Sequence, residues 1–261
     1  SHRIMAKLVW LGQRPFLNEA WKRVYGHSLP FNDPIHAAFK KTPPLMFYAY
    51  SKHILPKPVD WSEVQCVTGY WFLKAKQEWK PSAELEQFLA SGSKPVYIGF
   101  GSMNDGRNKS GSIKTLILET VKRTGQRAVL LNAGLGLVQS ELPENIFVTE
   151  PVPFEYLFPK MAAVVHHGGA GTTAAALRAG VPSVITPLIY DQRFWSWCVE
   201  NIGAGTTPIA WNKVTVDNLT AGINTALAND DIKNRALQTS ERMREENGIE
   251  KTIELFNSYY C

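Results

Sequence analysis

Residues that can bind a phosphate gather in one short stretch of the second half of the chain. His166 and His167 come directly before the segment Gly168–Thr172, which reads GGAGT. Glycines allow the backbone to approach a ligand closely, and an imidazole and a threonine hydroxyl offer polar hydrogens. Where such a turn leads into a helix, the free N–H groups of the first helical turn favour an anion. This stretch therefore predicts a phosphate-binding turn.

The two adjacent histidines could also suggest a metal site. Side chains of neighbouring strand residues point to opposite faces, so His166 and His167 are not expected to hold one ion together. No cysteine or acidic cluster nearby completes a ligand set. The sequence therefore predicts no metal site, and we assign the phosphate contact to His166 rather than to the pair. The alternative is that one histidine packs in the core and the other lies in a solvated loop.

The predicted turn belongs to a strand–helix–strand unit. An apolar run at 162–166 suits a buried parallel strand, and the alanine-rich residues 172–179 suit a helix. Gly180 is the expected C-cap, with Pro182 just beyond it, and residues 183–186 form the second strand. In such a unit the helix N-terminus lies beyond the carboxyl ends of the strands, where α/β proteins bind phosphates.

Other groups with useful chemistry also follow predicted strands. Asp191 and Gln192 offer a carboxylate and an amide to sugar hydroxyls, and Asp191 could at the same time be the N-cap of the helix that starts there. Ser102 follows the strand at 95–100 and could donate to a phosphate or cap a turn. The segment Val152–Phe154 could present backbone groups and an apolar face to a planar base, or it could simply pack in the core.

The composition narrows the class of protein. The chain has 261 residues, 44% of them hydrophobic and 20% charged, with a net charge of +5, which fits a globular protein with a sizeable core. No basic run with interleaved aromatics is present, so nucleic acid is not an expected partner. Three widely spaced cysteines indicate a reducing compartment, and we find neither a secretory signal nor an apolar run of about 18 residues. We therefore expect a cytoplasmic location.

Strand and helix patterns alternate regularly from about residue 79 onward. The expected strands lie at 95–100, 127–131, 146–149, 162–166, 183–186 and 205–209. The expected helices include 82–90 capped by Ser82, 112–124, 172–179, 194–201, one capped by Thr215 and one from Asp230. This alternation predicts an α/β fold with a Rossmann-like doubly wound parallel sheet. Residues 1–78 show no such alternation, and the pattern at 8–25 predicts one or two helices interrupted by Gly12 and Pro15.

The stretch HHGGAGTTAAALRAGVPSVITP, together with DQRFW at 191–195, resembles the donor-binding motif of UDP-sugar-dependent glycosyltransferases with the GT-B fold. It is most similar to that of the sterol 3-beta-glucosyltransferases of fungi and bacteria. VTGYWF at 67–72 resembles the family's linker, and GFGSM at 99–103 resembles the end of one of its strands. The resemblance extends over about residues 45 to 255.

The resemblance implies two parts. Residues 1–78 would be the remnant of an acceptor-side N-terminal domain with its linker, and residues 79–261 would be the nucleotide-sugar donor-binding domain. The implied function is the UDP-glucose-binding part of an inverting, metal-independent glucosyltransferase that acts on a sterol 3-hydroxyl, with no cofactor. Asp191 and Gln192 would contact the glucose. The residues implied to contact UDP are Ser102, Val152, Pro153, Phe154, His166, Gly168, Gly169, Ala170, Gly171 and Thr172.

Two features depart from the family pattern. Leu188, Ile189 and Tyr190 stand where the family commonly has an aromatic pair and a glycine before the Asp-Gln pair. The family's catalytic histidine and acceptor pocket lie near the start of its N-terminal domain, and no histidine of residues 1–78 stands in a matching context. The base, the pocket for a sterol or another lipophilic acceptor, and any peripheral membrane contact are therefore expected outside this chain.

Two other interpretations are left open by the residues. The chain could be a non-catalytic module that binds a UDP-sugar or acts as a scaffold. It could also be the donor subunit of a two-chain glycosyltransferase, as in the split dolichol-linked N-acetylglucosamine transferase.

Overall fold

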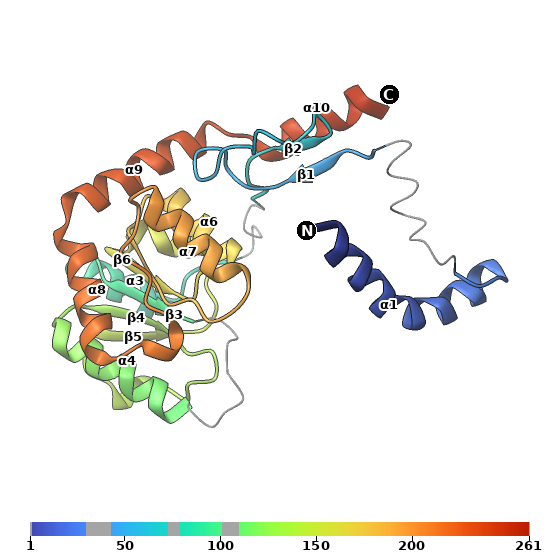
Figure 1. The fold of residues 1–261 in the computed structure, drawn as a ribbon. Helices are drawn as coiled ribbons and strands as arrows, with labels where there is room; N and C mark the ends of the chain where they lie inside the picture. Colours follow the sequence, from blue (N-terminus) through green and yellow to red (C-terminus); the bar gives the residue numbers. More distant parts are fainter. Residues whose placement is uncertain (1, 30–42, 73–78, 101–109, 261) are drawn as a thin grey trace. The chain divides into compact units, whose positions relative to one another are not determined.

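The computed structural model describes residues 2–29, 43–72, 79–100 and 110–260 (Figure 1). The chain divides into two compact units, one of residues 1–46 and 62–66 and one of residues 47–61 and 67–261. The predicted boundary at residues 78 and 79 falls inside the second unit. The assignment of residues 1–78 to an acceptor-side domain stays a prediction.

The first unit contains the helix α1 (His2–Tyr25), which runs without a break through Pro15. The predicted interruption is therefore absent. The segment after the helix folds back on it, because the Leu29 N–H donates to Asn18 Oδ1 (2.8 Å) and Arg14 Nη2 donates to the Leu29 carbonyl (3.0 Å). These bonds hold the helix on both sides of Pro15 and offset the backbone hydrogen bond that a proline removes.

The second unit is built on a five-stranded sheet with the order β5-β4-β3-β6-β7, in which every pair is parallel. Its strands are β3 (Val96–Gly99), β4 (Ala128–Leu131), β5 (Ile146–Thr149), β6 (Ala163–His166) and β7 (Ser183–Ile185). Two short strands, β1 (Met46–Tyr48) and β2 (Gln65–Val67), lie outside this sheet. Five of the six predicted strands are thus confirmed.

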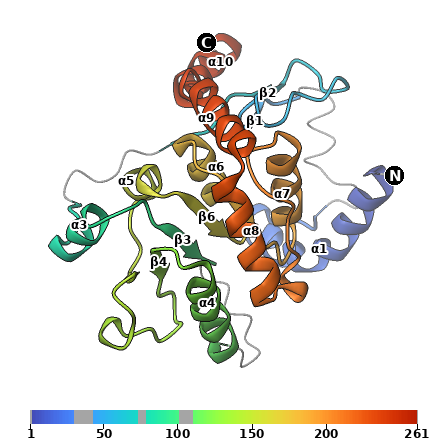
Figure 2. The ribbon, with the colours of Figure 1, turned by 90° about the vertical axis from the view of Figure 1, so that its left-hand side faces the viewer.

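Helices cover both faces of the sheet (Figure 2). The helices of this unit are α3 (Ala83–Ala90), α4 (Ser110–Thr124), α5 (Phe154–Leu157), α6 (Ala170–Ala179), α7 (Asp191–Asn201), α8 (Val216–Ala228), α9 (Asp230–Arg244) and α10 (Gly248–Tyr260). Val96 and Ile98 of β3 pack in a buried cluster with α4 and α8, whereas Tyr97 packs in a second cluster with α5 and α6. This alternation of side chains along a strand between two helical layers confirms the doubly wound architecture.

Several helix ends form where the sequence predicts them. Ser82 caps α3, since its Oγ accepts from the Leu85 N–H at 3.2 Å. Thr215 and Asn218 form a capping box at the start of α8, each side chain accepting from the other's backbone N–H. Gly180 ends α6 in the left-handed conformation, with φ of 72°. These local signals fix the lengths of the helices that pack on the sheet.

The sixth predicted strand, at 205–209, is reduced to a single parallel bridge between Gly205 and Ser183. The Thr206 N–H still donates to the Ser183 carbonyl at 3.0 Å. A regular parallel ladder would next need an N–H at residue 208, and Pro208 has none. The Ile185 carbonyl instead accepts from the Ile209 N–H at 2.9 Å, so the chain runs beside β7 without continuing the sheet.

Residues of the second unit that precede the sheet in the sequence pack against its helices. Ile54 is buried in a third cluster that includes Cys198 of α7 and Met243 of α9, and Tyr70 packs against it.

Among the described residues, no helix has the length and apolar character needed to cross a bilayer.

Candidate functional site

The winding direction of the sheet reverses between β3 and β6. From β3 the chain winds outward through β4 to β5, and from β6 it winds the opposite way to β7. The last paired residues of these two central strands are Gly99 and His166. In doubly wound sheets, ligands bind beyond the carboxyl ends of the strands where the winding direction changes. The predicted phosphate-binding turn starts at this point.

His166 is completely buried at the end of β6. Its Nδ1 accepts a hydrogen bond from the Gly168 N–H at 3.1 Å, so the ring proton lies on Nε2, which has no partner among the described residues. Burial, with a smaller contribution from His167, lowers the pKa of His166 to about 3. The ring is therefore neutral, and it fixes the shape of the turn. No atom of it is open to a ligand in this structure.

Position 168 requires a glycine, because any other residue would be strained there. Its φ is +87°, and a Cβ there would lie 2.8 Å from Ile185 Cγ2 and 3.0 Å from the Gln192 carbonyl oxygen. The turn after β6 therefore packs directly against the end of β7 and the first turn of α7. This packing brings the glycine turn and the Asp191-Gln192 segment together, as one site requires.

His167 is the histidine of the pair that lies at the surface of the turn. Its side chain is half-buried, and a Cβ at Gly169 would lie 2.5 Å from its Nε2, so the ring lies against the start of α6. Burial lowers the pKa of His167, and the charge of Asp191 opposes that shift. A neutral imidazole beside a helix N-terminus and facing a carboxylate can donate to an anionic ligand.

The N-terminus of α6 has no side-chain cap. Gly169 is the N-cap residue, and the N–H groups of Ala170, Gly171 and Thr172 have no acceptor among the described residues. The Thr173 N–H, one position further, donates to the Gly169 carbonyl at 2.9 Å. Three backbone donors at the positive end of a ten-residue helix form an arrangement that accommodates a phosphate.

Asp191 and Gln192 differ in what they offer. Asp191 is exposed at the first position of α7, and the N-cap is Tyr190, so the interpretation of Asp191 as the N-cap is wrong. Gln192 is 6% exposed, and its Oε1 accepts from the N–H groups of Leu188 (2.8 Å) and Ile189 (3.1 Å). Gln192 thus holds the loop before α7, while the Asp191 carboxylate stays open to a ligand.

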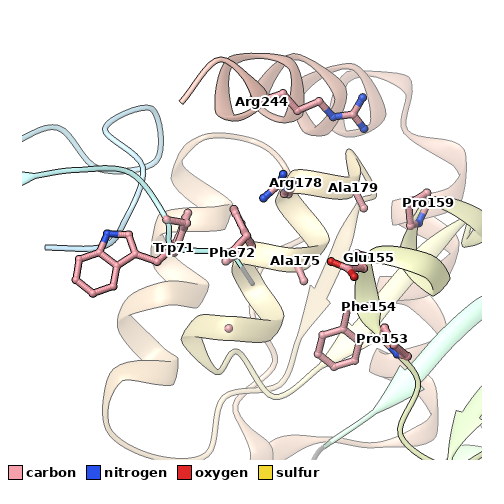
Figure 3. A pocket seen from close by; sticks show the side chains of 13 residues that line it. Trp71, Phe72, Pro153, Phe154, Glu155, Pro159, Ala175, Arg178, Ala179 and Arg244 are labelled. Carbon is pink, nitrogen blue, oxygen red and sulfur yellow. The ribbon is translucent and has the colours of Figure 1, made fainter. Parts of the chain in front are cut away.

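A cavity of about 540 Å³ adjoins α6 (Figure 3). Three of its lining residues, Pro153, Phe154 and Gly171, are among those predicted to contact UDP. Its other lining residues are Tyr70, Trp71, Phe72, Glu155, Pro159, Ala174, Ala175, Arg178, Ala179 and Arg244. The volume lies within the range of small-ligand pockets, and an apolar wall with two arginines suits an aromatic anion.

Within this cavity, aromatic and charged groups are paired in a defined way. Phe154 stacks on Phe158 with ring centroids 4.3 Å apart, and the Arg178 guanidinium lies 4.0 Å above the Phe72 ring. Arg178 and Arg244 come from different helices, α6 and α9, and Figure 3 shows both near the cavity. Their positive charges were not identified from the sequence, because no local motif signals a contact between α6 and α9.

The remaining predicted site residues have different environments. Ser102 lies outside the described residues. Val152 packs, partly buried, against the cluster under α5 and α6, so core packing accounts for its side chain. Ala170 and Thr172 are half-buried in the first turn of α6. Sequence reasoning also missed His167, although its position just beyond the last strand residue is the signal that separates it from buried His166.

Among the described residues, no group of three histidine, cysteine, aspartate or glutamate side chains could hold a metal ion. The candidate site consists of the uncapped start of α6, His167, Asp191 and the adjoining cavity.

Comparisons with known proteins show what the chain is similar to. Residues 116–252 match the family described as erythromycin biosynthesis protein CIII-like, C-terminal domain. The chain is 35% identical over 99% of its length to a sterol 3-beta-glucosyltransferase of Arabidopsis thaliana, of which it covers 42%. It is 36% identical over 97% of its length to a sterol 3-beta-glucosyltransferase of Vanderwaltozyma polyspora, of which it covers 21%. The chain thus spans less than half the length of these relatives.

Among solved structures, the glycotransferase of kitacinnamycin matches with a TM-score of 0.71 and 22% identity, over 98% of this chain and 66% of that one. This likeness confirms the predicted α/β fold with its parallel sheet.

Proposed function

Because the chain belongs to the glycosyltransferase family with an erythromycin biosynthesis protein CIII-like C-terminal domain, we propose that it binds the nucleotide-sugar donor of a transfer reaction. The donor we propose is UDP-glucose, and the acceptor is the 3-hydroxyl of a sterol, since the relatives named above are sterol 3-beta-glucosyltransferases. The observation that carries the proposal is the uncapped start of α6 at the point where the winding of the sheet reverses.

In this proposal the diphosphate binds at the N-terminus of α6. Three free N–H groups of Ala170, Gly171 and Thr172 converge there, and the His167 ring lies beside them. We therefore assign the phosphate contact to His167 in place of the fully buried His166. Each such bond to an anion contributes about 1.5–3 kcal/mol, and several together can hold a diphosphate.

The nucleotide base fits the adjoining cavity. Pro153 and Phe154 give it an apolar wall, and Gly171 connects the cavity to the first turn of α6. Arg178 and Arg244 outnumber the one carboxylate that lines the cavity, Glu155, so the charged lining is net positive, which favours the entry of a doubly charged nucleotide. Because Gly171 has no side chain, a single nucleotide can extend from the cavity, where its base lies, to the start of α6, where its phosphates lie.

The sugar lies next to α7 in this proposal. The exposed Asp191 carboxylate accepts from sugar hydroxyls, while Gln192 keeps the preceding loop in place. Asp191 also lies close enough to His167 for its charge to affect the pKa of that imidazole. The sugar and phosphate contacts therefore meet at the anomeric carbon.

The transfer is an inverting displacement. The acceptor oxygen attacks the anomeric carbon, the bond from that carbon to the diphosphate oxygen breaks, and a base takes the hydroxyl proton. Negative charge develops on the leaving diphosphate, and the N–H groups of α6 and His167 stabilise it there. We assign the base and the acceptor pocket to the part of the full-length relatives that this chain does not span.

Calorimetric titration with UDP tests the proposal. We expect His167→Ala to weaken UDP binding roughly ten- to a hundredfold, because a donor to an anion is lost. The matched control is His53→Ala, since His53 lies outside the site, 3.8 Å from the Glu246 carboxylate, and should leave UDP affinity unchanged. Absence of UDP binding to the unaltered chain, or equal effects of the two substitutions, would refute the assignment.

A further inference from the structure

Tyr190 has a backbone conformation that strongly favours glycine. Its φ is 45° and its ψ is −125°. The Ile189 carbonyl accepts from the Gln192 N–H at 3.2 Å, which closes a four-residue turn with Tyr190 at its second position. These angles are close to those of a type II′ turn, in which glycine normally occupies that position. A tyrosine here is therefore strained.

Among the described residues, little packing offsets the strain at this tyrosine. The side chain is 87% exposed, and its ring contacts no other ring among the described residues. A glycine would form the same turn without strain. Strained residues of this kind cluster at active sites and ligand-binding sites.

The position of Tyr190 is fixed relative to the proposed donor site. Gln192 Oε1 binds the two N–H groups just before Tyr190, and the Gln192 backbone carbonyl lies against Gly168 of the glycine turn. Asp191, the next residue, is the exposed carboxylate that we assign to the sugar. The loop that carries Tyr190 is thus held on both sides at the rim of the site.

We propose that Tyr190 is a specificity-determining residue that stacks its ring on the apolar C–H face of the donor sugar. This inference rests on the proposed function and identifies Tyr190 as a residue that distinguishes one donor sugar from another. A pyranose has hydroxyls around its edge and C–H groups on its faces, so a carboxylate and an aromatic ring side by side can recognise both parts. The Asp191 carboxylate accepts hydrogen bonds from the sugar hydroxyls, and the Tyr190 ring stacks on the C–H face of the sugar.

Parallel titrations with UDP and UDP-glucose test this role in the unaltered chain, Tyr190→Gly and Tyr190→Phe. We expect all three proteins to bind UDP equally. Tyr190→Gly should bind UDP-glucose roughly three- to tenfold more weakly than the unaltered chain, and Tyr190→Phe should bind it normally, because the ring is kept. The melting temperature of Tyr190→Gly should rise by roughly 2–4 °C, because the turn is relieved of strain.

Other results separate the two claims. If Tyr190→Gly weakens UDP and UDP-glucose binding equally, or weakens neither, the stacking role is refuted while UDP binding by the unaltered chain still supports the donor site. If the unaltered chain binds no UDP, the donor site itself is refuted, and the role of Tyr190 with it.

Discussion

The two glycines of the turn, Gly168 and Gly171, should respond in opposite ways to alanine. At Gly168 the backbone φ is +87°, which costs an alanine about 1–2 kcal/mol. The added Cβ would also lie 2.8 Å from Ile185 Cγ2 and 3.0 Å from the Gln192 carbonyl oxygen. One of these atoms belongs to backbone that cannot rotate away, so overpacking adds about 1–3 kcal/mol. Gly168→Ala should therefore lower the free energy of unfolding by about 2–5 kcal/mol.

Gly171→Ala is the matched control for stability. No heavy atom lies within 4 Å of a Cβ at that position, and the residue is exposed in the first turn of α6. Alanine has the higher helix propensity, so we expect the free energy of unfolding to stay unchanged or to rise by up to about 1 kcal/mol. The same methyl group would enter the space proposed for the nucleotide, so Gly171→Ala should weaken UDP binding without unfolding the protein.

Urea unfolding followed by circular dichroism gives both free energies, and calorimetry gives the UDP affinities. A loss below about 1 kcal/mol for Gly168→Ala would show that the turn adjusts easily and would refute the packing argument. An equal loss for both variants would refute the distinction between a glycine needed by the fold and a glycine needed by the ligand.

Three further outcomes are expected. Because burial keeps the folded-state pKa of His166 at about 3, below its ordinary value of 6.5, the unfolded chain binds the proton first, so stability should fall as the pH drops from about 6.5 to 3. His166→Asn keeps an acceptor for the Gly168 N–H but cannot titrate, so acid unfolding curves that coincide for the two proteins would contradict this. Thr215→Ala removes the capping box of α8 and should lower the free energy of unfolding in urea by about 1 kcal/mol, whereas an unchanged midpoint would argue that the cap is dispensable. Chelation of divalent cations by EDTA should leave the calorimetric affinity for UDP unchanged, and a loss beyond about tenfold would indicate a metal-dependent site.

Much of the fold follows from local signals in the sequence. The strand at 163–166, the glycine turn and the helix closed by Gly180 are each specified within about twenty residues, so their pattern predicts them directly. Ser82 and Thr215 mark helix starts for the same reason. The strand predicted at 205–209 does not form for a reason that is also local, because Pro208 lacks the N–H that a regular ladder would need at that position.

The site was harder to predict because it depends on contacts between distant segments. The sequence suggests that His166 binds the phosphate, but only the packing of β6 shows that this ring is enclosed and that His167 lies outside it. Likewise, nothing near Gln192 signals that its carboxamide oxygen is already bonded to the loop before α7. The strain at Tyr190 is visible only in the backbone angles.

Hydrogen–deuterium exchange at the start of α6 tests the central claim most directly. The N–H groups of Ala170, Gly171 and Thr172 have no acceptor among the described residues, so they should exchange rapidly in the free protein. Thr173 provides an internal control, because its N–H already donates to the Gly169 carbonyl at 2.9 Å. With saturating UDP, exchange at 170–172 should slow strongly while Thr173 changes little. Unchanged exchange at 170–172 would contradict the account that this helix end holds the diphosphate.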